Sequence, residues 1–259
     1  MTVGVCVRHP GRETGVRCAR CDRPACPACL REASVGYQCV DCVGQGARSQ
    51  PRAKAIPWAQ PSARSVVVVP ILIAINVAVF VVTVVQAASL SHNAYAPLFR
   101  QWALEPEMVA HGAWWRLLTS GFLHIGLLHL TFNMIALWVL GRDLEQVLGR
   151  VRFVVVYLVS LLGGSLVVFL FANPASNTAG ASGAVFGLMG SLAVVLIRLR
   201  LSPRPALTII ALNVIISFAV PNISILGHLG GLAFGAAVTT VMIYIGSHLS
   251  TGFVHSGDK

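Results

Sequence analysis

The chain has 259 residues, of which 56% are hydrophobic and only 11% are charged. Ordinary soluble domains contain ~25% charged residues, and the mean hydropathy here is +0.75. This composition excludes an ordinary water-soluble domain and indicates an integral membrane protein. The formal net charge of +10 is uneven, because ten of the 19 Lys and Arg residues precede residue 66. That distribution favours the surface of an anionic lipid bilayer over nucleic acid as the partner of the basic residues.

Residues 1–45 form a cysteine-rich unit that contains all seven cysteines of the chain. Their odd number and their C-x-x-C pairs argue against disulfide bonds and for metal binding in a reducing compartment. A unit so small, with few apolar residues, needs structural metal ions to fold. Two four-coordinate zinc ions with no open position are therefore predicted. Their expected ligands are Cys6, His9, Cys18, Cys21, Cys26, Cys29, Cys39 and Cys42.

Residues 46–65 are rich in Pro, Ala, Ser and Arg and are expected to form a flexible basic linker. No cleavable signal peptide is expected, because the first 30 residues contain no long apolar stretch. Residues 66–248 consist of apolar runs with short breaks, and residues 249–259 form a tail. A membrane-spanning helix needs ~20 apolar residues. Six spans are predicted, at about residues 66–88, 122–140, 151–171, 182–199, 205–221 and 225–246.

Arginines in two of the loops predict how the spans are oriented. Three arginines lie in or next to the loop between the second and third spans, and three in or next to the loop between the fourth and fifth, namely Arg142, Arg150, Arg152, Arg198, Arg200 and Arg204. The positive-inside rule places both of these loops, and hence both termini, in the cytoplasm of a plasma-membrane protein. The long loop at residues 89–121 then lies outside. Its tryptophans indicate a segment in the outer membrane interface.

Four polar residues fall near the outer ends of three predicted spans. Ser182 lies in the sequence G-A-S-G, residues 180–183, where the fourth span begins. His129 and Asn133 are four residues apart and share one face of the second span, and His228 lies near the start of the sixth. Polar groups in hydrocarbon are costly and need a role. Because the four residues share one depth, they are predicted to meet near the outer surface.

Small residues predict how two of these spans approach each other. Gly183 and Gly187 on the fourth span, and Gly231 and Gly235 on the sixth, are each four residues apart. Such pairs let helix backbones approach closely in lipid. Close approach of these two helices would bring Ser182 within reach of the sixth span's histidine.

Taken together, these motifs resemble those of the rhomboid family of intramembrane serine proteases. The resemblance covers about residues 66–248 and implies an all-α bundle of six transmembrane helices preceded by the small cytoplasmic two-zinc domain. Four elements carry it, and they occur in the right order on the right segments. They are Trp115-Arg116, His124-x4-His129-x3-Asn133, G-A-S-G with Ser182, and His228-x2-Gly231-x3-Gly235.

The resemblance also implies roles for individual residues. Ser182 would be the nucleophile and His228 the general base. His129 and Asn133, with the backbone N–H of Ser182, would stabilise the oxyanion, and Phe186 would pack against the catalytic histidine. The implied activity is that of an endopeptidase that cleaves transmembrane protein substrates at a site open to the outer face.

No Asp or Glu lies within any predicted span, so the expected machinery is a Ser-His dyad without a carboxylate. Stacking on Phe186 is then expected to hold the imidazole in place. His124 is five residues before His129, or about 140° away around a helix, and is not expected to share its face. The resemblance gives His124, Trp115 and Arg116 structural roles.

The order of the zinc ligands resembles that of the B-box type of zinc finger, in which ligand pairs interleave. The resemblance implies Cys6, His9, Cys26 and Cys29 on one zinc ion and Cys18, Cys21, Cys39 and Cys42 on the other; sequential pairing is the alternative. The unit is expected to bind a cytoplasmic protein partner or to regulate the protease, without nucleic acid and without a metal for catalysis.

Two other functions remain open on the sequence. A non-enzymatic membrane adaptor would use the zinc unit to recruit partners, but an inactive relative is expected to lack the serine or the histidine. A transporter would line a path with polar residues, but the predicted spans contain no acid that could couple ions.

Overall fold

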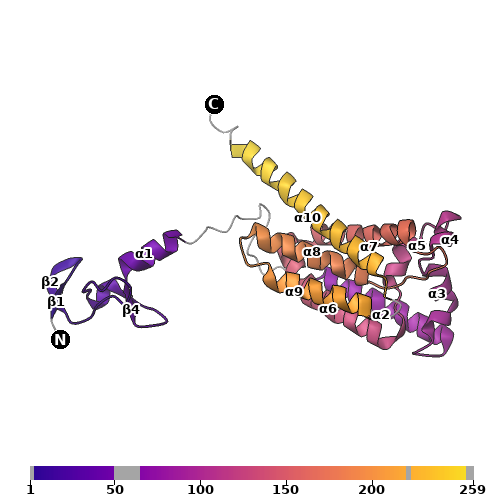
Figure 1. Ribbon diagram of the computed structural model, residues 1–259, viewed down its shortest axis with the longest axis horizontal. Helices are drawn as coiled ribbons and strands as arrows, with labels where there is room; N and C mark the ends of the chain where they lie inside the picture. Colours follow the sequence, from indigo (N-terminus) through magenta and orange to yellow (C-terminus); the bar gives the residue numbers. More distant parts are fainter. Residues whose placement is uncertain (1–2, 50–64, 220–222, 255–259) are drawn as a thin grey trace. The chain divides into compact units, whose positions relative to one another are not determined.

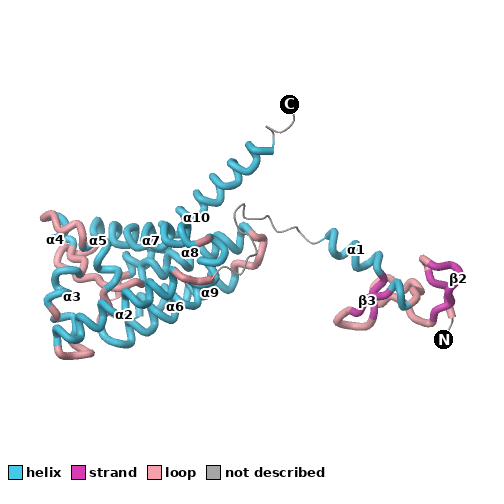
Figure 2. Tube along the Cα trace, turned by 180° about the vertical axis from the view of Figure 1, so that it is seen from behind, coloured by secondary structure: helices cyan, strands magenta, loops and turns pink. Residues whose placement is uncertain are grey.

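The computed structural model describes residues 3–49, 65–219 and 223–254 of the chain. Most of the expected linker, at residues 50–64, and the end of the expected tail, at residues 255–259, lie outside these residues. The chain divides into two compact units, Met1–Ala53 and Lys54–Lys259. Figure 2 shows that all of the strands belong to the first unit, whereas the described part of the second consists of helices and loops.

The N-terminal unit contains two short antiparallel hairpins that the sequence analysis did not predict. Strands β1 (Gly4–Cys6) and β2 (His9–Thr14) form the first, and β3 (Leu30–Glu32) and β4 (Tyr37–Cys39) form the second. The 3-10 turn η1 (Pro27–Cys29) precedes β3, and helix α1 (Val40–Ser49) follows β4. Of the eight residues in its buried core, six are cysteines. The unit therefore has almost no apolar core of its own.

The second unit is built from helices of very different lengths (Figure 1). After helix α2 the chain makes several short turns, and five long helices follow. In chain order the elements are α2 (Val68–Ala87), η2 (Asn93–Tyr95), α3 (Pro97–Trp102), α4 (Pro106–Ala110), α5 (Arg116–Thr119), η3 (Ser120–Phe122), α6 (Gly126–Leu148), α7 (Arg150–Phe171), α8 (Ser182–Arg198), α9 (Arg204–Ala219) and α10 (Ile225–Val254).

Six apolar helices lie at the six predicted positions, but they do not all have the length of a membrane span. Three are long and apolar enough by themselves, namely Val68–Ala87, Arg150–Phe171 and Ile225–Ile245. Helix α6 qualifies as a fourth only together with the segment Arg116–Phe122, from which it is bent by 93°. Helices α8 and α9 have 17 and 16 residues and are shorter. The chain is thus a multi-pass membrane protein.

The second predicted span begins later than expected. Helix α6 starts at Gly126, which has a φ of +71°, after the extended residue Ile125. His124 therefore lies before the helix, and the helical angle calculated for it from the sequence is wrong. The break has a physical cause, because a glycine can adopt the left-handed conformation at the start of α6 and so lets the chain change direction there.

Helix α8 lies at the centre of the bundle and places the candidate serine there. Ten of its 17 residues are buried. Helices α10, α7, α6 and α9 all pack against it. It carries two of the glycines that the sequence singled out, and its first residue is Ser182. A central helix with small residues can be approached closely by its neighbours.

Glu145, near the end of α6, stabilises the start of α2. Its carboxylate is 2% exposed and accepts hydrogen bonds from the N–H groups of Val67, Val68 and Val69 at 2.8, 3.0 and 3.0 Å. The first N–H groups of a helix lack partners within the helix, and a negative charge there is favourable. Glu145 thus fixes the start of the first long helix of the second unit.

Candidate active site

The G-A-S-G sequence forms the turn that starts α8. Gly180 has a φ of +137°, and its N–H donates to the carbonyl of Ser120 at 2.9 Å. A Cβ atom at this position would lie 2.8 Å from Cε1 of His129. Glycine is therefore required at position 180 for two reasons: its backbone conformation, and the lack of room for a side chain beside His129. The turn leaves Ser182 at the first position of the buried helix.

The predicted contact between the glycines of α8 and α10 is confirmed. A methyl group added at Gly231 would overlap the carbonyl group of Gly183, and one added at Gly235 would overlap the backbone of Gly187. The two backbones touch at both places, as small residues four apart allow. This contact fixes the distance between the start of α8 and the start of α10.

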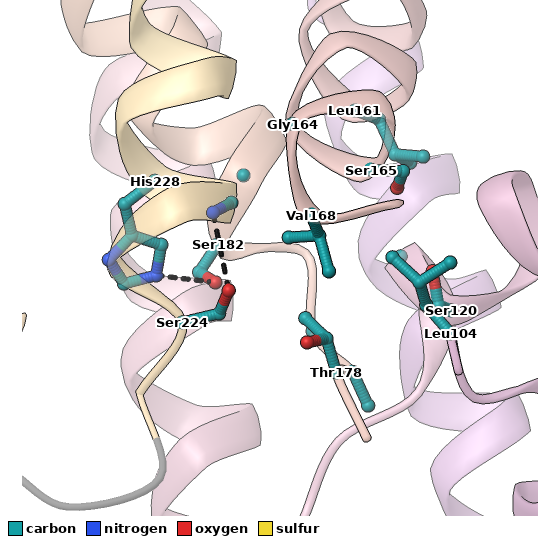
Figure 3. A pocket seen from close by; sticks show the side chains of 15 residues that line it. Leu104, Ser120, Leu161, Gly164, Ser165, Val168, Thr178, Ser182, Ser224 and His228 are labelled. Atoms are coloured by element: carbon teal, nitrogen blue, oxygen red, sulfur yellow. Dashed lines mark hydrogen bonds between the residues drawn. The ribbon is translucent and has the colours of Figure 1, made fainter. Parts of the chain in front are cut away.

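Ser182 and His228 come together at this contact. Oγ of Ser182 lies 2.8 Å from Nε2 of His228, although the residues are 46 positions apart. Figure 3 shows the two side chains directed toward each other in one pocket. The pocket also has hydroxyl groups on its walls, from Ser120, Ser165, Thr178 and Ser224. A serine hydroxyl beside an imidazole nitrogen at this distance can transfer its proton and act as a nucleophile.

The ring of Phe186 lies against that of His228. The two rings are stacked, with centroids 4.1 Å apart and planes 16° from parallel. Phe186 follows Ser182 by one turn of α8, so the same helix presents the hydroxyl and supports the imidazole. This is the arrangement that the family resemblance implies.

A residue that the sequence analysis missed contacts the other nitrogen of the imidazole. Oγ of Ser217, on α9, lies 2.7 Å from Nδ1 of His228. The only sequence signal was a polar residue near the outer end of the fifth predicted span. Its contact with the histidine depends on how α9 is rotated against α10, which periodicity within one helix does not give.

The two candidate oxyanion residues, His129 and Asn133, differ in their hydrogen bonds and in whether they face the turn at Ser182. The N–H of Ile125 donates to Nδ1 of His129 at 3.4 Å, which leaves Nε2 of this ring as its donor. That nitrogen faces Gly180 and so lies beside the turn that holds Ser182. The amide of Asn133 instead donates to the carbonyl of His129 at 2.9 Å. Among the described residues it has no hydrogen bond to the serine.

His124 also contacts the turn that starts α8. It is completely buried, and its Nε2 lies 3.5 Å from the N–H of Ala181. Its ring centroid is 5.1 Å from that of His129, so the two rings are neighbours even though they do not share a helix. Arg116 is likewise buried and donates to the carbonyl of Ala103 at 2.6 Å, which ties together the segment between α2 and α6.

The part of the chain that contains these residues matches a known family. The Rhomboid domain family matches residues 111–245, more than half of the chain. The chain belongs to the rhomboid family. The matched region of this rhomboid protein includes Ser182, His228, His129 and Asn133, and it leaves out the cysteine-rich unit.

Curated rhomboid proteins from bacteria and plants are similar to this one. It is 38% identical to Rhomboid protease GluP of Bacillus subtilis over 176 residues, which make up 60% of this chain and 34% of GluP. It is 39% identical to Putative rhomboid protease YdcA of the same species over 132 residues, which make up 49% of this chain and 66% of YdcA. RHOMBOID-like protein 7 of Arabidopsis thaliana is 31% identical over 209 residues. The chain thus spans about a third of GluP and just under two thirds of YdcA.

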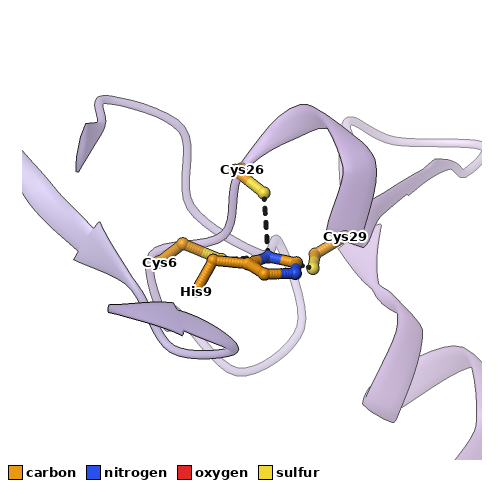
Figure 4. A group of neighbouring side chains, drawn as sticks. All are labelled: Cys6, His9, Cys26 and Cys29. Atoms are coloured by element: carbon orange, nitrogen blue, oxygen red, sulfur yellow. Dashed lines mark hydrogen bonds between the residues drawn. The ribbon is translucent and has the colours of Figure 1, made fainter. Parts of the chain in front are cut away.

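The N-terminal unit of this rhomboid protein holds two clusters of possible metal ligands. One consists of Cys6, His9, Cys26 and Cys29, whose ligand atoms all lie within 4.8 Å of one another. Figure 4 shows the three sulfur atoms around Nδ1 of His9, at 3.8, 3.4 and 3.3 Å. Bond lengths of ~2.3 Å to sulfur and ~2.0 Å to nitrogen place tetrahedral ligands about 3.5 Å apart. The cluster therefore fits a zinc ion.

The second cluster consists of Cys18, Cys21, Cys39 and Cys42. The sulfur atoms of Cys21 and Cys39 are 3.8 Å apart, which also suits a tetrahedral ion. The N–H of Cys39 donates to the sulfur of Cys18 at 3.1 Å. The grouping of the ligands is the interleaved one and not the sequential one.

The ionisation of the thiols suits metal binding. Hydrogen bonding to the backbone of Cys26 lowers the pKa of Cys6 to about 6, and the backbone of Cys39 lowers the pKa of Cys18 to about 6. Burial raises the pKa of Cys29 to about 11. Zinc binds thiolates, and a cation favours the loss of the remaining protons. At least one thiol in each cluster thus has a lowered pKa, which favours the thiolate form that a metal ion binds.

Proposed function

We propose that this protein is an intramembrane serine endopeptidase that hydrolyses peptide bonds in or near the transmembrane helices of other membrane proteins. The distance of 2.8 Å between Oγ of Ser182 and Nε2 of His228 carries the proposal. The names of the relatives GluP and YdcA as rhomboid proteases support it. The geometry favours an enzyme over a membrane adaptor, because an adaptor has no need of an aligned hydroxyl and imidazole.

The chemistry would follow the steps of a serine protease. Nε2 of His228 takes the proton of Ser182 while Oγ attacks the carbonyl carbon of the substrate. The imidazolium then gives the proton to the leaving nitrogen, and the peptide C–N bond breaks to leave an ester on Ser182. Water next attacks this ester, with His228 first accepting its proton and then returning it to Oγ. A Ser-His dyad performs both halves, without a carboxylate and without a metal.

The negative oxygen that forms at each attack needs hydrogen-bond donors at a fixed place. Removing one such donor costs roughly 100- to 1000-fold in rate in serine proteases. Nε2 of His129 faces Gly180, and this nitrogen and the backbone N–H of Ser182 would act as donors. Asn133 has two amide hydrogens, and only one is used for the carbonyl of His129. A turn of its side chain would add a third donor.

The short central helix suits a site that water must reach. Helix α8 has 17 residues and rises about 26 Å, against ~30 Å for the hydrocarbon core. We infer six membrane spans, with the start of α8 below the outer surface. The loop before it is not helical, but Thr178 pairs with the backbone of Leu104 at 2.8 and 2.9 Å. Such a loop is tolerated at membrane depth when its backbone N–H and C=O groups find hydrogen-bond partners within the protein.

The arginine loops support an orientation with both termini in the cytoplasm of a plasma-membrane protein and the pocket open to the outer face. The substrate is then another transmembrane helix, approached within the bilayer. Its backbone must unwind before the carbonyl can be attacked. Gly, Pro or polar residues near its outer end would lower the cost of unwinding.

The two cysteine clusters would each hold a structural zinc ion. Both have four protein ligands and no open position for substrate. The unit would serve protein interaction or regulation in the cytoplasm. Because zinc replaces the missing apolar core, its removal is expected to unfold this unit.

The first test of the activity is labelling with a fluorophosphonate, which reacts with activated serines. We expect the full-length protein in detergent or vesicles to be labelled, and the Ser182→Ala variant to lose the label completely. Ser191→Ala, in the same buried helix, is the control and should be labelled like the wild type. Equal labelling of wild type and Ser182→Ala would refute the proposal.

A second test separates zinc from catalysis. We expect two zinc ions per chain by mass spectrometry of the metal content, and one in a Cys26→Ser variant. A chelator should make the N-terminal unit sensitive to trypsin while leaving cleavage of a model membrane substrate within about twofold, because the metal lies outside the active site. A loss of cleavage in proportion to the zinc removed would instead show that the metal is needed for the reaction.

A further inference from the structure

The hydroxyl of Ser217 makes two short contacts at once. Oγ lies 2.7 Å from the carbonyl oxygen of Asn213, one turn earlier on α9, and 2.7 Å from Nδ1 of His228 on α10. The side chain is 6% exposed and the imidazole 7% exposed. Both contacts are thus protected from competition with bulk solvent. Of the groups described around this ring, Ser217 is the one that faces Nδ1, whereas Ser182 faces Nε2 and Phe186 covers a face.

The number of hydrogens decides how these contacts are made. A serine hydroxyl carries one hydrogen and two lone pairs, whereas a carbonyl oxygen only accepts. The contact with Asn213 therefore uses the hydrogen of Ser217. If the hydroxyl donated to His228 instead, two lone pairs would face each other at 2.7 Å on the side of Asn213. The arrangement that satisfies both contacts has Nδ1–H of His228 donating to Oγ of Ser217.

We propose that Ser217 is a positioning residue that fixes His228 in the tautomer with the proton on Nδ1. This inference rests on the proposed serine protease activity. With Nδ1 protonated, Nε2 carries the lone pair and faces Ser182 at 2.8 Å, ready to accept its proton. Ser217 then also accepts from the imidazolium that forms during the attack. Ser217 thus takes the place of the carboxylate that orients the histidine in a Ser-His-Asp triad.

The loss of kcat expected on removing the Ser217 hydroxyl can be compared with two known magnitudes. Placing the histidine of a serine protease in the wrong tautomer lowers kcat about 10⁴-fold, whereas one neutral hydrogen bond is worth about tenfold or less. We expect Ser217→Ala to lower kcat about tenfold, with KM changed less than twofold, because the residue acts on the base and not on substrate binding.

A pair of variants with the same shape isolates the hydroxyl. Thr in a helix can hydrogen-bond the carbonyl one turn earlier, as Ser217 does. We expect Ser217→Thr to keep kcat within about threefold of the wild type, and Ser217→Val to fall about tenfold below Ser217→Thr. Both variants add the same bulk, so a difference between them reports the hydroxyl alone. Equal kcat values for the two would overturn the proposal.

Ser191 provides the matched control for lost stability. It is completely buried, and its hydroxyl also makes two contacts, with the carbonyl of Gly235 at 3.1 Å and Oγ1 of Thr239 at 2.7 Å. Ser191→Ala removes a buried interhelical hydrogen bond without touching His228. We expect its melting temperature to fall as much as that of Ser217→Ala, with kcat within about twofold of the wild type. A tenfold loss of kcat in Ser191→Ala would instead assign the Ser217 effect to helix packing.

A spectroscopic measurement tests the tautomer without any activity. Nitrogen-15 NMR of the full-length protein with labelled histidine rings distinguishes Nδ1–H from Nε2–H, and the signal missing in His228→Ala identifies this ring. We expect Nδ1–H in the wild type and in Ser217→Thr, and a mixture of tautomers in Ser217→Val. Finding Nε2–H in the wild type would overturn the inference. If the tautomer is Nδ1–H but Ser182→Ala still cleaves substrate, the proposed activity fails and the hydrogen-bond assignment stands.

Discussion

His228→Ala is expected to lower kcat/KM for a transmembrane substrate by at least about 10³-fold, with the protein still inserted in the membrane. The ring is the only described group within hydrogen-bond distance of Oγ of Ser182, so its loss leaves the hydroxyl without a base. In serine proteases of another fold, removal of the histidine lowers kcat by about 10⁶-fold. The measurement is cleavage of a purified model substrate reconstituted in vesicles, followed by gel analysis of the products.

The control for this variant is His111→Ala. His111 is an exposed histidine at the end of α4, and its Nδ1 lies 2.8 Å from the carbonyl of Glu107. It lies outside the pocket, so this variant should cleave at the wild-type rate. Ser182→Ala and the double variant Ser182→Ala/His228→Ala should be no less active than His228→Ala alone, because residues that act as a unit are not additive. Cleavage by His228→Ala within tenfold of the wild type would rule out the histidine as the base.

Gly231→Ala is expected to lower kcat about 100-fold or more, although the residue carries no chemical group. An added methyl would overlap the carbonyl of Gly183, whose neighbour is Ser182, so α8 and α10 must move apart. A displacement of about 1 Å at a reacting pair costs ~10²-fold in rate. Overpacking of this kind also costs ~1–3 kcal/mol in stability. Both kcat and the melting temperature should therefore fall.

The matched control adds bulk to the same helix at an exposed position. Ala237 is exposed on α10, and Ala237→Leu should leave kcat and melting temperature close to those of the wild type. Fluorophosphonate labelling of Gly231→Ala should slow together with cleavage, since the distance between Ser182 and His228 has changed. Normal labelling with lost cleavage would place the effect on substrate entry and would contradict our explanation.

The sequence determined the features that depend on local chemistry. Apolar stretches located the six long helices of the second unit, because segments of that composition leave water for lipid or for the protein interior. Glycines four residues apart predicted the contact of α8 and α10, because a small surface on one face of a helix is set by its own 3.6-residue period. Ser182 and His228 stood out as polar residues near the ends of apolar spans, and the family resemblance supplied their roles. The cysteines stood out as closely spaced pairs.

The tertiary structure decided what depends on how separate segments are rotated and shifted against one another. The contact of Ser217 with His228, the cap that Glu145 places on α2 and the interleaved Cys/His clusters each join residues from different elements. The displacement of His124 from α6 follows from one positive φ at Gly126, which a window of apolar residues does not reveal. A helical period fixes which face a side chain is on, whereas the partner on that face is fixed only when the helices pack.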